Sequence, residues 1–90
     1  MLRWLIKLSS ITVYIYYFAS LKDATHIEKE TRVVPSQTTV EQLFLTLNDQ
    51  YQFSISIQQL RVAINYRFES WSYQLKSNDI VGFIPPVSGG

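Results

Sequence analysis

The chain has 90 residues, of which 47% are hydrophobic and 14% aromatic, so its composition predicts one folded domain rather than a disordered tail. The absence of cysteine excludes disulfides and thiolate zinc sites, and a single histidine excludes a multi-histidine metal centre. Eight basic and seven acidic residues give a net charge of +1 without a basic run, so we expect no nucleic-acid partner.

Residues 1–20 combine features of a targeting segment with those of a strand. Arg3 and Lys7 precede an apolar stretch that ends in small residues, as in a signal peptide. The stretch is rich in β-branched and aromatic residues, however, and polar residues interrupt the roughly 20 apolar residues that a membrane span needs. We therefore expect residues 1–10 to be an extension of unassigned role, and we expect no membrane anchor.

Two strands are predicted in the first third of the chain. Residues 11–18 are eight mostly β-branched and aromatic residues, a run typical of a central strand that is buried on both faces. Residues 20–24 favour a helical turn. Residues 26–34 then alternate in character and predict a second strand with one face exposed.

A single main helix is predicted after a break at residues 35–38. Thr39 and Gln42 have the spacing of a capping box, which places the start of the helix. The apolar positions that follow fall on one helical face, and the pattern ends near residues 48–50. These positions, which we expect to cover the sheet, are Val40, Leu43, Phe44 and Leu47.

The second half of the chain predicts two more strands. The secondary structure of residues 51–59 is ambiguous, because this polar stretch has only scattered apolar residues. Residues 60–64 show the alternation of side chains that is typical of a strand, and Asn65 and Tyr66 are expected to form a tight turn after it. After an aromatic loop at residues 71–74, for which the sequence suggests no function, residues 77–79 form a turn. Residues 80–84 are the last strand, which a diproline ends.

This order of elements predicts an α+β fold of the β-grasp type. A mixed sheet of four to five strands would be packed on one face by the main helix. The expected organisation is an extension at residues 1–10, a β-grasp domain at residues 11–84 and an extended tail at residues 85–90.

The interior of the chain offers no predicted active site. Glu28 and Glu30 lie on one side of a half-exposed strand, where we expect solvation and no neighbour that would shift a pKa. His26 has no partner at metal-ligand spacing, so we expect a surface histidine at a turn. Gly82 stands alone in a strand and forms no phosphate-binding loop. Lys22 remains an interaction candidate, although a solvated charge explains it equally well.

The carboxyl-terminal tail is the remaining candidate for chemistry. Proline restricts φ and glycine has no Cβ, so a diproline followed by a diglycine end makes a slender segment that fits a narrow channel. Another enzyme can activate a terminal glycine carboxylate as an acyl adenylate, because no side chain hinders attack at its carbonyl. A frayed terminus is the alternative interpretation.

Three segments resemble the small subunit of molybdopterin synthase, the MoaD-type sulfur carriers of the ThiS/MoaD superfamily. Residues 78–90, which end in FIPPVSGG, carry the most specific likeness, and residues 62–65 and 16–23 resemble the third and first strands of that family. The likeness extends over residues 11–90. The sequence departs from the family where glycines are usual, at Thr25 and His26 and before the last strand, where Asn78 tolerates a left-handed backbone.

The resemblance implies a ubiquitin-like carrier, a non-catalytic subunit that binds no cofactor itself. An activating enzyme would use ATP to adenylate Gly90, and a sulfurtransferase would supply the sulfur of the resulting thiocarboxylate. That group would donate sulfur to cyclic pyranopterin monophosphate while the tail is inserted into the large synthase subunit. The tail residues concerned are Pro85, Pro86, Val87, Ser88, Gly89 and Gly90.

The resemblance also implies an assembly and a partner surface. Two small and two large subunits would form a cytoplasmic heterotetramer. The family's apolar contacts would fall on Phe18, Phe68 and Ile84, and its basic contact would fall on Lys22. Ordinary sheet packing remains an alternative role for Phe18 and Ile84.

Two other functions remain open. A sulfur carrier of the thiazole pathway shares the fold and the diglycine, although Pro85 and Pro86 argue against it. A ubiquitin-like modifier or interaction module would use the same fold without sulfur chemistry.

Overall fold

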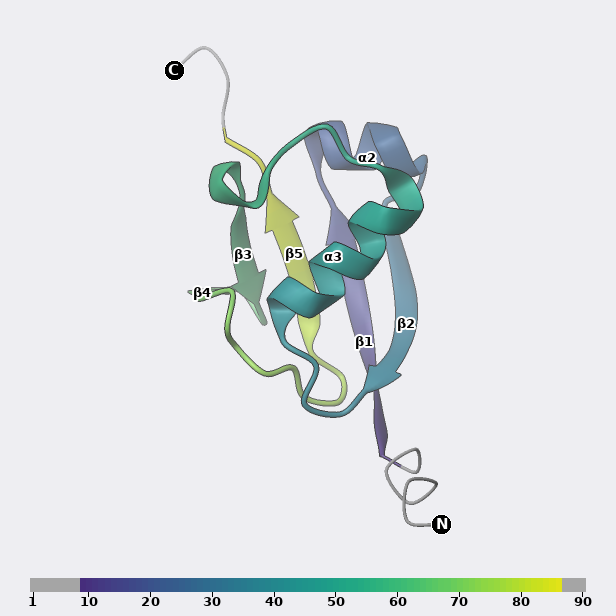
Figure 1. Cartoon of the computed structure of the whole chain (residues 1–90), viewed down its shortest axis with the longest axis vertical. Coiled ribbons are helices and arrows are strands. Elements are labelled where there is room, and N and C mark those ends of the chain that lie inside the picture. Colours follow the sequence, from purple (N-terminus) through teal and green to yellow (C-terminus); the bar gives the residue numbers. More distant parts are fainter. Residues whose placement is uncertain (1–8, 87–90) are drawn as a thin grey trace.

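The computed structural model describes residues 9–86 (Figure 1). Residues 1–8 of the extension predicted at residues 1–10, and residues 87–90 of the tail, lie outside the described part, whereas Ser10 already belongs to the first strand. Within the described part, neither α-helix is long and apolar enough to cross a membrane. The elements, in chain order, are β1 (Ser10–Tyr17), α2 (Ala19–Thr25), β2 (Lys29–Pro35), α3 (Val40–Tyr51), the 3-10 turn η1 (Ile57–Gln59), β3 (Arg61–Ile64), β4 (Arg67–Glu69) and β5 (Ile80–Ile84).

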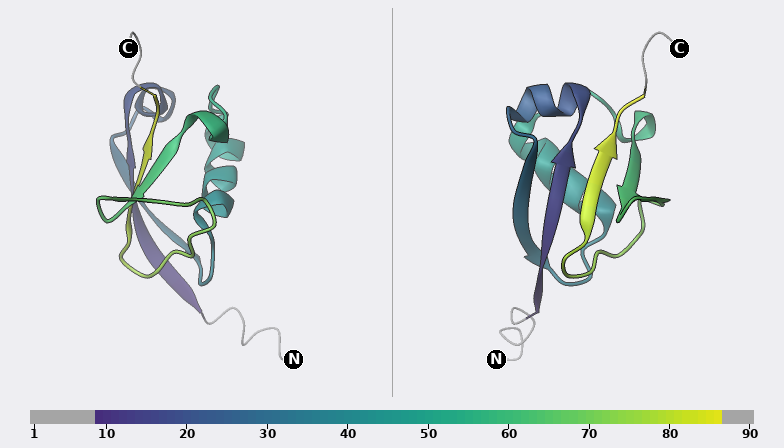
Figure 2. Two further views of the ribbon diagram at one scale, coloured as in Figure 1. Left: turned by 90° about the vertical axis from the view of Figure 1, so that its left-hand side faces the viewer. Right: turned by 180° about the vertical axis from the view of Figure 1, so that it is seen from behind.

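The strands form one mixed sheet in the order β2-β1-β5-β3-β4. The central pair β1 and β5 is parallel, and the other neighbouring pairs are antiparallel. Helix α3 crosses one face of this sheet, as the views in Figures 1 and 2 agree. The predicted α+β fold of the β-grasp type is confirmed, with β4 as a short edge strand in a segment to which the sequence analysis assigned no element.

Helix α3 begins where the capping box predicts. The backbone N–H of Gln42 donates to Thr39 Oγ1 at 3.2 Å, and the Gln42 side chain accepts from the backbone N–H of Thr39 at 2.9 Å. The four predicted apolar positions are all buried, so this face of α3 makes the core with the sheet. The helix ends at Tyr51, one residue beyond the predicted range, and Gln52 follows in a left-handed conformation.

The aromatic loop at residues 71–74 has a structural role that the sequence did not suggest. The Trp71 ring stacks on Phe83 at 6.0 Å and meets Phe44 edge-on at 5.6 Å. The loop carbonyls of Trp71 and Tyr73 accept from the backbone N–H groups of Glu41 and Val40, both at 3.0 Å. The loop therefore satisfies amides that the first turn of α3 leaves without helical partners.

The expectation that β1 is buried on both faces is wrong. Val13, Ile15 and Tyr17 are buried under α3, but the alternate residue Tyr14 is 38% exposed. Because α3 covers one face only, no helix of residues 9–86 lies over the middle of the other face (Figure 2). The aromatic residues on that face follow β-strand alternation, yet they contact solvent.

Candidate functional site

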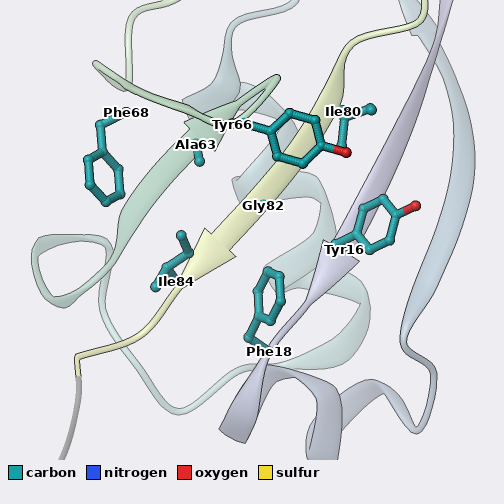
Figure 3. A pocket seen from close by; sticks show the side chains of 8 residues that line it. All are labelled: Tyr16, Phe18, Ala63, Tyr66, Phe68, Ile80, Gly82 and Ile84. Atoms are coloured by element: carbon teal, nitrogen blue, oxygen red, sulfur yellow. The ribbon is translucent and has the colours of Figure 1, made fainter.

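The uncovered face of the sheet, which we call the open face, contains an apolar hollow of about 380 Å³. Its floor comes from β1, β5 and β3, and the β3–β4 hairpin forms one side (Figure 3). The lining residues are Tyr16, Phe18, Ala63, Tyr66, Phe68, Ile80, Gly82 and Ile84.

Large apolar side chains on the open face are strongly exposed. Phe18 is 46% exposed, Phe68 is 57% exposed and Tyr66 is 86% exposed. Clustered exposed aromatic residues are characteristic of surfaces that bind another protein, because the free domain gains nothing from leaving them in water. The open face is therefore the best candidate for a binding site within residues 9–86.

Gly82 gives the hollow its depth. It lies in the buried middle of β5, between Tyr16 of β1 and Ala63 of β3. A Cβ at this position would lie 3.3 Å from Cε2 of Phe18, which is tighter than ordinary contact. The missing side chain thus allows the Phe18 ring to lie against the strand.

The β3–β4 hairpin holds Tyr66 in an unusual backbone conformation. Asn65 and Tyr66 have φ values of 52° and 72°, so both central residues of the predicted turn are left-handed. The Asn65 side chain fixes the turn, since it donates to Asp79 Oδ1 and accepts from the backbone N–H of Ile80, both at 2.9 Å. A bulky residue at a position that favours glycine is held there at some energetic cost, which suggests a use for the exposed ring.

The structure brings together three of the four predicted partner contacts. Phe18, Phe68 and Ile84 line one hollow although they come from three different segments. Sequence reasoning missed Tyr16 and Tyr66, which lie beside them. The alternation of β1 and the turn position of Tyr66 were the available signals, but both depend on knowing which face is uncovered.

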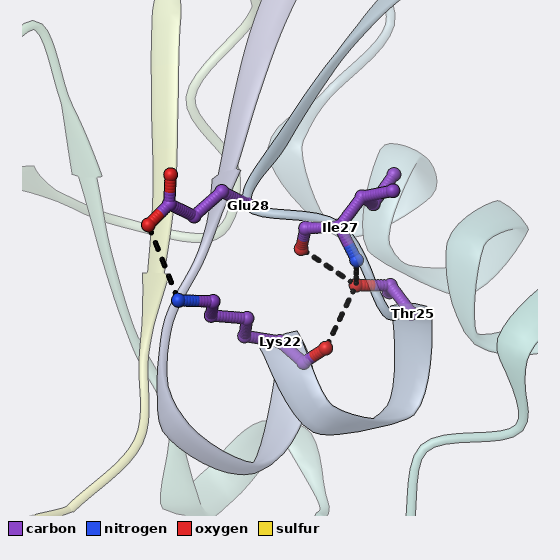
Figure 4. Close-up of polar contacts among 4 residues, drawn as sticks. All are labelled: Lys22, Thr25, Ile27 and Glu28. Atoms are coloured by element: carbon purple, nitrogen blue, oxygen red, sulfur yellow. Dashed lines mark hydrogen bonds and ion pairs between the residues drawn. The ribbon is translucent and has the colours of Figure 1, made fainter.

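Lys22, the fourth predicted contact, lies at a neighbouring corner between α2 and β2. Its Nζ atom is 3.1 Å from Glu28 Oε2, and both side chains are largely exposed (Figure 4). An exposed pair of this kind contributes little to stability. Lys22 is therefore available to a partner at small cost.

The same corner shows how the chain turns without the usual glycine. His26 is exposed and ends α2 in a left-handed conformation with φ of 64°, which confirms the predicted surface histidine. Thr25 is buried, and its Oγ1 accepts from the backbone N–H of Ile27 at 3.2 Å (Figure 4). The hydroxyl also lies 3.0 Å from the Ile27 carbonyl, so the threonine fixes the turn locally.

The expectation that Glu30 is merely solvated, with no neighbour that shifts its pKa, is wrong. Its carboxylate accepts hydrogen bonds from Tyr17, from Tyr51 at 3.0 Å and from Arg32 Nε at 3.1 Å. Burial opposes ionisation, but these three donors outweigh it and lower the pKa of Glu30. The cluster ties the end of α3 to β1 and β2 on the helix side of the sheet. It lies away from the open face, so its role is structural.

Metal binding has no support in the described part of the chain. Residues 9–86 contain no group of three or more His, Cys, Asp or Glu side chains that could hold a metal ion. The features that remain for function are the open face and the tail that follows β5.

Comparison with protein families decides which group of β-grasp proteins this is. The model of the ThiS family matches residues 15–90. The chain belongs to the ThiS family. This result confirms the resemblance to the ThiS/MoaD superfamily drawn from the sequence, and the match includes both the open face and the diglycine tail.

Three solved structures illustrate what this ThiS-family chain is similar to. A Pyrococcus furiosus protein provisionally named molybdopterin converting factor, subunit 1, is 26% identical with a TM-score of 0.76, over 86% of this chain and 99% of that one. Small archaeal modifier protein 1 from Methanosarcina acetivorans is 23% identical with a TM-score of 0.70, over 90% and 98%. A chain from the complex of subunits 1 and 2 of molybdopterin-converting factor from Helicobacter pylori is 20% identical with a TM-score of 0.60, over 89% and 100%. The second and third likenesses support the fold alone.

Proposed function

We propose that the chain is the sulfur-carrying small subunit of molybdopterin synthase. One observation carries the proposal: the exposed apolar hollow of the open face ends at Ile84, directly where the Pro-Pro-Val-Ser-Gly-Gly tail begins. A partner that docks on the hollow is thereby placed to receive the tail. The match to the ThiS family over residues 15–90 supports the carrier function, and the likeness to the Pyrococcus furiosus protein provisionally named molybdopterin converting factor, subunit 1, supports the choice of pathway.

The proposed chemistry takes place at Gly90 and needs enzymes other than this chain. An activating enzyme joins the Gly90 carboxylate to the AMP part of ATP and releases pyrophosphate. Sulfur supplied by a sulfurtransferase at the oxidation level of sulfide then attacks the acyl carbon as hydrosulfide, AMP leaves, and a thiocarboxylate remains without any further oxidant or reductant. This group gives its sulfur to cyclic pyranopterin monophosphate and returns to a carboxylate by taking oxygen from water. ATP is thus a substrate of the activating enzyme, and the carrier needs no cofactor.

The proposed principal partner is the large synthase subunit. The Helicobacter pylori structure is a complex of subunits 1 and 2 of molybdopterin-converting factor, which supports a partnership of this kind. Two copies of this chain would bind a dimer of large subunits. Each copy would insert its residues 85–90 into a large subunit. Phe18, Phe68, Ile84 and Lys22 are the proposed contacts.

The intact mass of the protein tests the carrier chemistry. The protein is incubated with the activating enzyme, ATP and a sulfide source, and with each of the three omitted in turn. The expected result is a mass gain equal to the replacement of one oxygen by sulfur, only in the complete mixture. An unchanged mass in the complete mixture would refute the proposal. Amide linkage to lysines of other proteins would instead indicate a modifier, and sulfur delivery to a thiazole synthase alone would indicate the thiazole pathway.

Phe68→Arg should weaken the complex with the large subunit at least about tenfold, because it places a charge in an apolar contact. Leu45→Arg is the matched control, since Leu45 is 55% exposed on α3, on the other side of the sheet, and Phe68 is 57% exposed. Titration calorimetry measures both affinities. Equal affinity of the two variants would show that the large subunit does not bind the open face.

A further inference from the structure

Arg61 is a cation that lies next to the apolar hollow, beside two of the residues that line it, Phe68 and Ile84. It is exposed, and its guanidinium carbon lies 3.9 Å from the centre of the Phe68 ring. In the sheet register it stands opposite Ile84, the last residue of β5 before the tail. This cation–π contact holds the guanidinium over the ring, beside the place where the tail leaves the domain.

The guanidinium of Arg61 has no acidic partner within residues 9–86. The two ion pairs of this range join Lys22 to Glu28 and Arg32 to Glu30. Stacking uses the face of the guanidinium and leaves its N–H donors at the edge, where they can bind a carboxylate in a bidentate manner. The donors of Arg61 are therefore preoriented and unused by the described residues.

The charged residues at the strand positions of the open face have one sign, and Glu28, which borders the face beside Tyr16 and Phe18, is paired with Lys22. Residues directly opposite each other in an antiparallel pair share a face, so Arg61 lies on the open face with Ile84, and Lys29 lies there with Tyr16. Along each strand, every second residue shares that face. The strand positions that do so carry no Asp or Glu: Ser10, Thr12, Tyr14, Tyr16, Lys29, Thr31, Val33, Pro35, Arg61, Ala63, Phe68, Ile80, Gly82 and Ile84.

We infer that Arg61 binds a carboxylate of the large synthase subunit and that the docking surface of that partner is apolar in the centre with an acidic residue facing Arg61. The inference rests on the proposed function and adds a specificity-determining contact to it. An apolar group of the partner enters the hollow, while an Asp or Glu side chain meets the stacked guanidinium. The charge match orients the partner around the base of the tail.

The pair Arg61 and Arg67 allows a matched test. Both are exposed arginines on neighbouring strands, but Arg67 stands opposite Ile64, a residue of the helix-covered side, and not on the open face. Arg61→Glu and Arg67→Glu change the net charge equally. We expect Arg61→Glu to weaken binding of the large subunit from the same organism at least about tenfold, and Arg67→Glu to change it less than about threefold. Affinity is measured by calorimetry at low and high salt, with thermal unfolding as a check on the fold.

Further measurements distinguish a failure of the Arg61 contact from a failure of the proposed function. Arg61→Lys should keep part of the affinity, since the charge remains while the planar stack and the bidentate geometry are lost. Added salt should weaken the wild-type complex more than the Arg61→Ala complex. Equal losses in the two glutamate variants, or none in Arg61→Glu, would overturn the inference while the wild-type complex stands. Absence of wild-type binding would overturn the proposed function itself.

Discussion

Deletion of Gly90 should lower sulfur transfer by at least about 100-fold, because reactions in enzyme sites lose that much when the reacting atom is misplaced by about 1 Å. The shortened chain still ends in a glycine, Gly89, so the chemical nature of its terminal carboxylate is unchanged. What changes is reach: the acyl carbon is withdrawn by one residue, about 3.3–3.6 Å in an extended chain. The experiment thus separates the position of the carboxylate from its identity.

The deletion of Gly90 should not change the stability of the fold. The buried core cluster of the described residues lies between Val13 and Phe83, so we expect the deletion of Gly90 to leave this cluster unchanged. Thermal unfolding should be unchanged, while thiocarboxylate formation, read by intact mass, and pterin sulfuration should both fall. Leu45→Arg, with an intact tail, is the control that should remain active. Full activity of the shortened chain, or of a chain extended by one alanine after Gly90, would refute the role of the Gly90 carboxylate.

The sequence predicted correctly those elements that depend on residues close to one another in the chain. Helix α3 followed from a capping box and a helical apolar period, and the turns at Asn65 and Asn78 followed from residues that tolerate positive φ. Strand β4 was missed because three exposed residues have no periodicity of their own and are ordered by pairing with β3. The aromatic loop was left without a role because Trp71 acts through Phe44 and Phe83, which are distant in sequence.

The candidate site was predicted in part, for the same reason. Family resemblance placed Phe18, Phe68 and Ile84, but a pattern of apolar residues does not distinguish a face covered by a helix from one left open. That ambiguity produced the incorrect burial expected for β1 and concealed Tyr16 and Tyr66. The stacking of Arg61 on Phe68 joins two strands across a hairpin, so composition alone does not reveal it.

Glu30 should contribute strongly to the stability of the fold, a role that the alternation of its strand did not indicate. Glu30→Ala would leave the hydroxyl of the buried Tyr17 without its acceptor and Arg32 without its counter-charge. We expect a loss of about 2–4 kcal/mol in the free energy of unfolding at neutral pH, less than for a fully buried pair. Urea unfolding measures the loss. Glu28→Gln is the control, since its exposed pair with Lys22 should contribute less than about 1 kcal/mol.

The pH dependence of stability distinguishes the contribution of the charge of Glu30 from the contribution of its packing and hydrogen-bond geometry. Because the folded-state pKa of Glu30 lies below its ordinary value of 4.5, ionisation stabilises the fold above that pH, and this contribution is lost as the pH falls through the lowered pKa. Glu30→Gln keeps an acceptor oxygen but has no charge to lose. Its deficit relative to the wild type should therefore be largest near neutral pH and shrink below pH 4.5. A deficit that stays constant across this range would mean that packing and hydrogen-bond geometry, and not the ionised carboxylate, hold the end of α3 to the sheet.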